Sequence, residues 1–350
     1  MTDKKISSKL KILNAEYGDC FILSVTDGEN TANILIDSGP NKSYLDVVKP
    51  ELENLEFDLC IITHFDEDHS KGLAIYLSED INRISKIHKY WINSPSLIEV
   101  NDNPEVSPYS TCNSLSKLFE RYEKENNCKV DCHEEVTAGK IYCDPKGLFN
   151  ITVLSPTKES KRDFLKNYTS RYSGNEVSGT SKKSTLDRTL EDWAKTDTSS
   201  LVKGNQTVND SSISCLIKTE DKTYLMLGDT REEIILPWLK KYKEMNGYKL
   251  KVDYMKIPHH GSMYNMTEAI FNYVECSNFI ISTNGRYGLP DRAVIAKILM
   301  SVEPSKRDEI KLFFNYESSK MEDNGAYFLT EEEIKSGLYN FIIDLNKVCQ

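Results

Sequence analysis

The sequence predicts an α/β (α+β) sandwich, in which two mixed β-sheets pack face to face and helices cover their outer sides. Three observations lead to this expectation. Short apolar runs with strand character recur along the chain, helical patterns are interspersed among them, and some runs are apolar throughout, as strands covered on both faces are. No period of about 20 to 50 residues repeats, which makes a solenoid a poor interpretation.

The first part of the chain is expected to form mostly strands. The segments with this character are 10–13, 20–25, 33–37, 59–63 and 87–92. A Thr-Asp-Gly turn separates the second from the third, which indicates a hairpin. Helical spacing of apolar residues follows at 70–77 and at 113–125.

The second part of the chain alternates strands and helices. Strands are expected at 148–154, 213–218, 223–228, 254–257, 278–283, 310–314 and 338–344, and helices at 232–245, 267–273 and 291–300. We interpret 1–350 as a single domain. It carries a polar insertion at about 157–210, rich in Ser, Thr, Lys and Asn, and a C-terminal helix and strand extension at about 301–350.

Composition narrows the class of protein. The 350 residues are 39% hydrophobic and 28% charged, which suffices for a large core. No apolar run is long enough for a membrane span, the first residues lack a signal-peptide pattern, and the nine cysteines are scattered. We therefore expect a cytoplasmic protein with no membrane partner. The net charge of −10 argues against a protein that coats nucleic acid without specificity.

The strongest chemical signal is a loop with four potential metal ligands. His64, Asp66, Asp68 and His69 lie within six residues, directly after a predicted buried strand. Imidazole and carboxylate groups together suit Zn²⁺, Mn²⁺ or Fe²⁺. A merely solvated acidic loop would not explain two histidines here in a chain that has six in all.

Two further strand ends offer ligands. Asp229 follows the predicted strand at 223–228, where it is equally well explained as the N-cap of a helix. His259 and His260 follow the strand at 254–257, and two adjacent polar rings are poor core residues unless they have partners. Three strand ends with ligands favour one shared metal centre over three coincidences.

The motifs in this order resemble those of the metallo-β-lactamase superfamily. They are Asp37-Ser38-Gly39, the loop from Thr63 to His69, Leu227-Gly228-Asp229 and the run from Pro258 to Ser262. More narrowly, the chain resembles the hydrolase-like domain of the bacterial competence DNA-uptake channel protein and its free-standing relatives. The resemblance spans roughly residues 9–300, with the insertion less comparable. It implies a four-layer αββα fold with two mixed sheets flanked by helices.

The resemblance also implies a centre with two divalent ions, Zn²⁺ or Mn²⁺. The implied ligands are His64 and Asp66 for one ion, Asp68 and His69 for the other, Asp229 as the bridge, and either His260 or His259 to complete the second site. Asp68 would also orient the attacking water. Lys256 or the remaining histidine, with His259 the candidate, would stabilise developing negative charge. Asp19, Asp37, Asn93 and Ser262 would support these groups.

Three positions depart from the family pattern. Asp66 stands where many members have a second histidine, which shifts the preference toward harder ions such as Mn²⁺. Asn93 occupies the end of the strand after which a further histidine is expected, so the His64/Asp66 site is expected to bind its ion loosely. Leu289 precedes Pro290 where some relatives carry a histidine, and the resemblance implies the loss of a phosphate-contacting or acid-donating group.

The predicted function is that of a metal-dependent hydrolase. The resemblance favours phosphodiester substrates, either nucleic acid or a small phosphodiester. The alternatives are hydrolysis of a lactone, thioester or amide, and a catalytically weak metal-binding module that binds a partner. Basic residues between Lys158 and Lys203, interleaved with Phe164, Tyr168 and Tyr172, form a possible path for a nucleic acid, although a solvated insertion explains them better.

Overall fold

The first sheet of the protein is mixed and has six strands in the spatial order β1-β2-β3-β4-β5-β6. The computed structural model describes residues 5–93, 107–168, 183–198, 207–335 and 340–343. The strands of this sheet are β1 (Ser7–Ile12), β2 (Phe21–Thr26), β3 (Thr31–Ile36), β4 (Leu59–Ile62), β5 (Tyr90–Ile92) and β6 (Cys132–His133). The first three pair antiparallel, and β3 to β6 pair parallel.

The second sheet has eight strands in the order β16-β15-β14-β12-β10-β9-β8-β7. They are β7 (Ile141–Cys143), β8 (Asn150–Ser155), β9 (Ser214–Lys218), β10 (Thr223–Met226), β12 (Tyr254–Lys256), β14 (Asn278–Ile281), β15 (Lys311–Phe314) and β16 (Asn340–Ile343). Strands β7 to β10 pair antiparallel, whereas β10, β12, β14, β15 and β16 are parallel. A separate parallel pair joins β11 (Leu250–Lys251) and β13 (Val274–Glu275).

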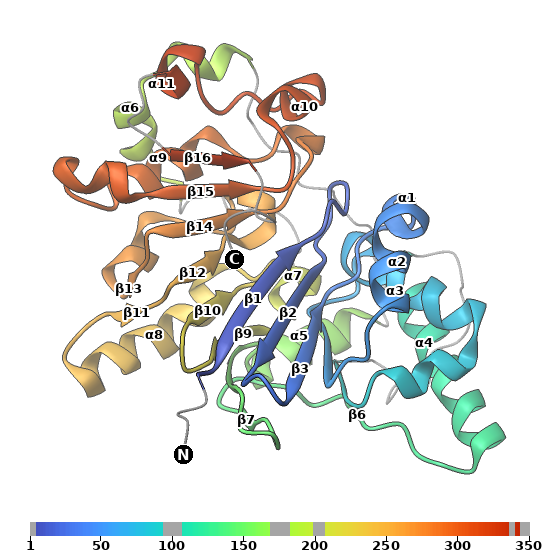
Figure 1. Ribbon diagram of the computed structural model, residues 1–350. Helices are drawn as coiled ribbons and strands as arrows, with labels where there is room; N and C mark the ends of the chain where they lie inside the picture. The colour runs from blue at the N-terminus through green and yellow to red at the C-terminus, as the bar shows by residue number, and fades with distance from the viewer. Residues whose placement is uncertain (1–4, 94–106, 169–182, 199–206, 336–339, 344–350) are drawn as a thin grey trace.

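Helices cover the outer faces of both sheets (Figure 1). Next to the first sheet lie α1 (Asn41–Ser43), α2 (Lys49–Glu53), α3 (Glu67–Glu79) and α4 (Ser107–Asn126). The remaining helices are α5 (Lys158–Tyr168), α6 (Leu190–Ala194), α7 (Thr207–Asp210), α8 (Glu232–Asn246), α9 (Arg292–Met300), α10 (Ser318–Asp323) and α11 (Glu331–Lys335). Short 3₁₀ turns lie at Ile81–Lys86, Lys183–Asp187, Pro258–Gly261, Glu268–Asn272, Arg286–Gly288 and Pro304–Glu309, and a π-helical turn joins α1 to α2 at Tyr44–Val48.

Strand β4 shows why some runs are apolar throughout. Ile61 faces the second sheet in the core between the sheets, where it belongs to one cluster with Val153 and Met226. Its neighbour Cys60 points to the opposite side, into the cluster that includes Leu73 of α3. Because both faces of the strand are covered, no position is left for a polar side chain. On the outer side of the second sheet, side chains of β12 and β14 pack with α8 and α9 in a third cluster.

The predicted arrangement of two mixed sheets flanked by helices is confirmed, but two elements begin at other residues than predicted and one helix is of another type. The helix expected from 70 begins at Glu67, because two acidic residues in its first turn suit the positive end of the helix dipole. The strand expected from 87 begins at Tyr90, after the 3₁₀ turn at Ile81–Lys86 and a single bridge at Ile87. The helix expected at 267–273 is a 3₁₀ turn at Glu268–Asn272.

The described part of the insertion packs onto the domain. Helix α5 contacts α7, and α6 contacts α9. Phe164, which we had considered for base stacking, is 1% exposed in the core below the first sheet, so it cannot stack on a nucleotide. Lys161 donates to the Glu134 carbonyl. Tyr172 lies outside the described residues, as does the side chain of Tyr168.

The C-terminal segment also joins the fold, since β15 and β16 extend the second sheet. Phe313 of β15 lies in the core between the two sheets. Among the described residues, no helix has the length and apolar character that crossing a lipid bilayer requires.

Candidate metal centre

The His64–His69 loop connects the carboxyl end of β4 to the first turn of α3. Phe65 anchors the loop in the core, and His64 and His69 are both buried. The backbone of a neighbouring loop lies directly against it: an added Cβ on Gly18 would stand 2.0 Å from the carbonyl oxygen of Asp68. Glycine is therefore required at position 18 for this approach.

Asp37, at the end of β3, orients the loop. Its carboxylate accepts hydrogen bonds from the backbone N–H of Thr63 (2.8 Å), from the Thr63 hydroxyl (2.8 Å) and from Nδ1 of His69 (2.9 Å). Because Nδ1 of His69 donates to a carboxylate, Nε2 is the ring nitrogen that faces the cluster and would bind a metal ion once it has lost its proton. A carboxylate behind an imidazole is the usual arrangement around a metal-binding histidine.

His64 is held in a similar way by hydroxyl groups. Its Nδ1 lies 3.1 Å from Oγ1 of Thr63 and 3.2 Å from Oγ of Ser212. The Nε2 atoms of His64 and His69 are both buried and have no hydrogen-bond partner. Since a buried polar atom without a partner costs free energy, this pair of nitrogens fits a site that a metal ion occupies.

Asp229 brings the second sheet into the centre. It follows β10, and the N-cap position of α8 is taken by Arg231, so Asp229 is not the helix cap that we had considered. Its Oδ2 lies 3.4 Å from Nε2 of His69 and 3.7 Å from Nε2 of His260. The carboxylate thus faces histidines from both sheets.

The two adjacent histidines occupy a strained turn after β12. His259 (φ 47°) and His260 (φ 55°) are both left-handed, as is Gly261 (φ 87°). This conformation is unfavourable for residues with a Cβ and is typical of functional sites. A Cβ on Gly261 would lie 2.5 Å from the Cβ of Pro290, so the turn also needs glycine for space.

The structure distinguishes the two rings. Nδ1 of His260 donates to the Ser282 carbonyl (2.8 Å), and its Nε2, the nitrogen that faces the cluster, donates to Oδ2 of Asp68 (3.1 Å) when no metal is bound. Nδ1 of His259 donates to Oδ1 of Asn265 (2.9 Å), and its Nε2 stands 3.8 Å from Asp229. His260 therefore lies inside the cluster, and His259 stands at its edge with 16% of its side chain exposed.

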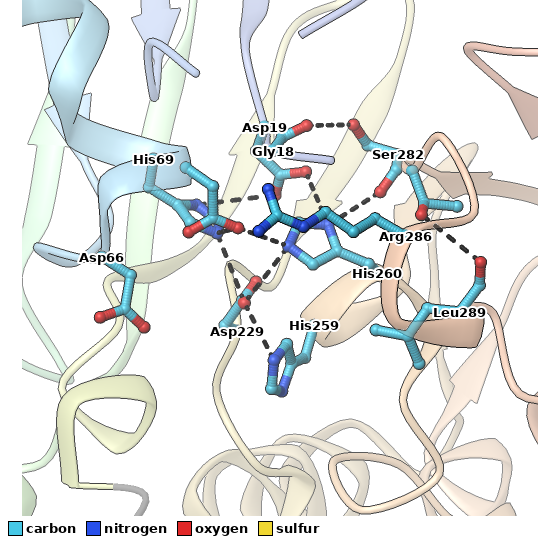
Figure 2. Close-up of polar contacts among 12 residues, drawn as sticks. Gly18, Asp19, Asp66, His69, Asp229, His259, His260, Ser282, Arg286 and Leu289 are labelled. Carbon is cyan, nitrogen blue, oxygen red and sulfur yellow. Dashed lines mark hydrogen bonds and ion pairs between the residues drawn. The ribbon is translucent and has the colours of Figure 1, made fainter. Parts of the chain in front are cut away.

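Two sets of ligand atoms lie side by side in the centre and share His69. One set is His64, His69 and Asp229, and the other is Asp68, His69 and His260; within each set all ligand atoms are within 4.8 Å of one another. Asp66 belongs to neither set, although its Oδ2 is 3.4 Å from Nε2 of His64. Figure 2 shows Asp66 apart from His260 and Asp229, which converge with His69.

The cluster has more negative than positive charge. Burial lowers the pKa of His69, but the carboxylates of Asp229, Asp68 and Asp37 outweigh it and raise this pKa well above its ordinary value. Burial would raise the pKa of Asp68, yet His69 and His260 hold it below its usual range. Without bound metal, the protonated imidazoles balance the negative charge of the carboxylates. Bound divalent cations would supply that positive charge instead.

Lys256 is buried next to Asp229 and Asp19. It is 1% exposed, donates to the Gly228 carbonyl (2.8 Å) and to Oδ1 of Asp229 (3.2 Å), and forms a short ion pair with Asp19. Burial lowers the pKa of Lys256, but the two carboxylates raise it above its ordinary value. The structure thus holds the buried ammonium of Lys256 against the carboxylates of Asp229 and Asp19.

Two of the supporting residues have structural partners. Asn93 exchanges two hydrogen bonds with the backbone of Val136, both 2.8 Å, so neither end of its amide is left for a metal. Ser262 is buried, and its backbone N–H donates to the His259 carbonyl, which closes the histidine turn.

The two mixed sheets are flanked by helices, and histidine and aspartate side chains at strand ends of both sheets meet in one centre. No protein-family model matches the chain, and no curated protein matches its sequence. Similar solved structures include a candidate metal-dependent hydrolase from Parabacteroides distasonis, with 12% identity and a TM-score of 0.36. The match covers 97% of the present chain and 94% of that protein's chain.

Two other solved structures are similar to the chain. The metallo-β-lactamase fold protein YhfI from Bacillus subtilis has 9% identity and a TM-score of 0.37, with 96% of each chain covered. The diiron β-hydroxylase CmlA from Streptomyces venezuelae has 13% identity and a TM-score of 0.41, with 97% of this chain and 53% of that one covered. Identities this low do not transfer a substrate to the present chain.

Proposed function

We propose that the protein is a metal-dependent hydrolase that cleaves phosphodiester bonds. The observation that carries the proposal is the pair of buried Nε2 atoms of His64 and His69, which lack hydrogen-bond partners and face carboxylates. Such a donor set fits divalent cations such as Zn²⁺ or Mn²⁺.

The chain offers ligands for two ions. An imidazole nitrogen binds one ion, and Nδ1 of His69 is already engaged by Asp37. We therefore assign His69, Asp68 and His260 to one ion and His64 with Asp66 to the other. Asp229 would contribute to both, because its carboxylate groups with His64 and also lies 3.4 Å from Nε2 of His69 and 3.7 Å from Nε2 of His260.

The carboxylate-rich set supports phosphodiesters as substrates. Bound divalent ions acidify water and stabilise charge on a phosphoryl oxygen, and a pair of them suits in-line displacement at phosphorus. The low pKa of Asp68 keeps its carboxylate ionised, so it can accept a hydrogen bond from an attacking water. The resemblance of the sequence motifs to the hydrolase-like domain of the competence DNA-uptake channel protein supports the same substrate class.

His259 has a role that differs from that of its neighbour. Its burial outweighs the nearby Asp229 and lowers its pKa, so the ring is neutral near pH 7. Because Nδ1 donates to Asn265, Nε2 can accept a proton at the exposed edge of the centre. We assign His259 to proton transfer and His260 to metal binding.

The adjacent histidines provide a matched pair for the test. Protein loaded with Mn²⁺ or Zn²⁺ should release p-nitrophenolate from bis-p-nitrophenyl phosphate. His260→Gln should lose both bound metal and turnover, whereas His259→Gln should keep its metal and lose turnover. Asp68→Ala and Asp229→Ala should be inactive. Bound metal without diester turnover would overturn the substrate class in favour of a lactone, thioester or amide, and neither metal nor turnover would indicate a partner-binding module.

A further inference from the structure

A positively charged group lies at the rim of the centre and takes no part in the ligand set. Arg286 is exposed, and its guanidinium carbon lies 4.1 Å from the ring centroid of Tyr17 and 4.6 Å from that of Tyr287. The two rings meet edge to face, with centroids 6.2 Å apart. Cation–π contacts of this kind hold the planar guanidinium in place and leave its charge uncompensated.

Arg286 differs from other arginines of this protein in having no carboxylate partner among the described residues. Arg83 pairs with Glu53 and Glu79, and Arg231 pairs with Asp210. Within the described part of the chain, no carboxylate oxygen lies within the 4.0 Å ion-pair distance of Arg286. Apart from its hydrogen bond with Tyr17, its guanidinium therefore keeps N–H donors that no described carboxylate occupies and that an anion from solution can reach.

Arg286 and its aromatic neighbour Tyr17 stand next to the ligands of the centre. Tyr17 immediately precedes Gly18, whose backbone lies against that of Asp68. Burial raises the pKa of Tyr17, and the carboxylate of Asp68 raises it further, as expected for neighbouring groups. Figure 2 shows the Arg286 side chain extended across the cluster, with its guanidinium between His69 and His260 in this view.

The backbone of the rim is rigidly held. Gly285 has a φ of 90°, and a Cβ there would lie 2.4 Å from the Met321 carbonyl oxygen. The N–H of Arg286 donates to Oδ1 of Asn284 (3.0 Å), whose Nδ2 donates to Glu16 (2.7 Å), next to Tyr17. The turn that carries Arg286 and the loop that carries Tyr17 are thus tied together, so the guanidinium is positioned before any ligand arrives.

We propose that Arg286 binds a phosphate oxygen of the substrate beside the metal centre and thereby selects an anionic phosphodiester over a neutral ester. This inference rests on the proposed function, which places the scissile phosphodiester bond at the metal centre. A guanidinium can donate two parallel N–H bonds to a phosphate, which an ammonium cannot reproduce. Leu289, three residues later on the same turn, is buried and apolar and offers no polar contact.

The first test compares an anionic and a neutral substrate. In Mn²⁺-loaded Arg286→Met, the KM for bis-p-nitrophenyl phosphate should rise on the order of tenfold, the loss expected for one exposed charge-assisted contact. Metal content, kcat and the hydrolysis of neutral p-nitrophenyl acetate should stay unchanged. Arg286→Lys should fall between wild type and Arg286→Met. Arg121→Met, which removes an exposed arginine of α4 paired with Glu125, should behave as wild type.

The second test does not require turnover. Thymidine 5′-monophosphate binding to the metal-loaded protein, measured by calorimetry, should weaken on the order of tenfold in Arg286→Met but not in Arg121→Met. If the wild type fails to hydrolyse diesters while nucleotide binding still depends on Arg286, the proposed function falls and the anion site stands. If neither KM nor nucleotide affinity responds to Arg286→Met, the inference is overturned even in an active phosphodiesterase.

Discussion

Asp37→Asn tests whether the carboxylate behind His69 prepares the metal site. In the wild type, Oδ1 accepts from the Thr63 N–H, and Oδ2 accepts from the Thr63 hydroxyl and from Nδ1 of His69. An amide has one oxygen, so whichever way it turns, either the Thr63 N–H or the His69 Nδ1–H meets an NH₂ group. One charge-assisted hydrogen bond is lost, which is worth about 1.5–3 kcal/mol. If His69 moves its proton to Nε2 to escape this clash, it blocks the nitrogen that binds metal.

We therefore expect the metal affinity of Asp37→Asn to fall about 10- to 100-fold, the usual effect of removing such a partner. The assay is a competitive titration of Zn²⁺ and Mn²⁺ against a chromogenic chelator. Asp144→Asn is the matched control, because Asp144 is also buried and accepts from a backbone N–H (Leu148, 3.0 Å) but touches no ligand of the centre. Equal metal affinities for Asp37→Asn and wild type would refute the assigned role of Asp37.

Three further predictions concern stability and pH. Gly18→Ala places a Cβ against the backbone of Asp68, which cannot swing aside, so urea unfolding should show a loss of about 1–3 kcal/mol; an unchanged midpoint would count against the close packing. Lys256→Met leaves two carboxylates buried without their ammonium and should cost about 3–5 kcal/mol in metal-free protein, with part of the loss recovered on adding Mn²⁺. Identical losses with and without metal would disprove the shared electrostatic origin. The raised pKa of His69 means that its protonation stabilises the metal-free fold fully below the ordinary pKa of about 6.5, and this contribution is lost as pH rises through the raised value. A bound cation replaces that proton, so metal affinity should increase with pH, and calorimetry in buffers of different ionisation enthalpy should reveal proton release. Binding heats that are independent of the buffer would show that His69 is neutral before metal binds.

Much of the fold follows from local patterns in the sequence. The apolar run of β4 requires cover on both faces, and the structure provides the second sheet on one side and α3 on the other. The sequence predicted the 3₁₀ turn at Glu268–Asn272 less well, because the spacing of its apolar residues is equally compatible with one turn of α-helix. Short segments carry too few residues for their periodicity to decide.

The candidate site depended more strongly on tertiary structure. Asp229 was as good a helix cap as a ligand until the structure placed Arg231 at the cap and the Asp229 carboxylate beside His69. The choice between His259 and His260 rests on their hydrogen-bond partners, Asn265 and the Ser282 carbonyl, which lie on different segments. Adjacent residues with the same side chain cannot be told apart by sequence.

The sequence by itself determined where ligands occur along the chain. Histidines and aspartates directly follow apolar strands, and the carboxyl ends of parallel strands gather at one edge of a sheet, so proximity within each sheet was predictable. Only the tertiary structure decided how the edges of two sheets meet, which buries Lys256 between Asp19 and Asp229 and brings Arg286 against Tyr17 at the edge of the centre. The physical reason is that burial and charge pairing depend on groups remote in sequence. The same lysine or arginine can serve a buried ion pair or an open anion site according to what packs against it.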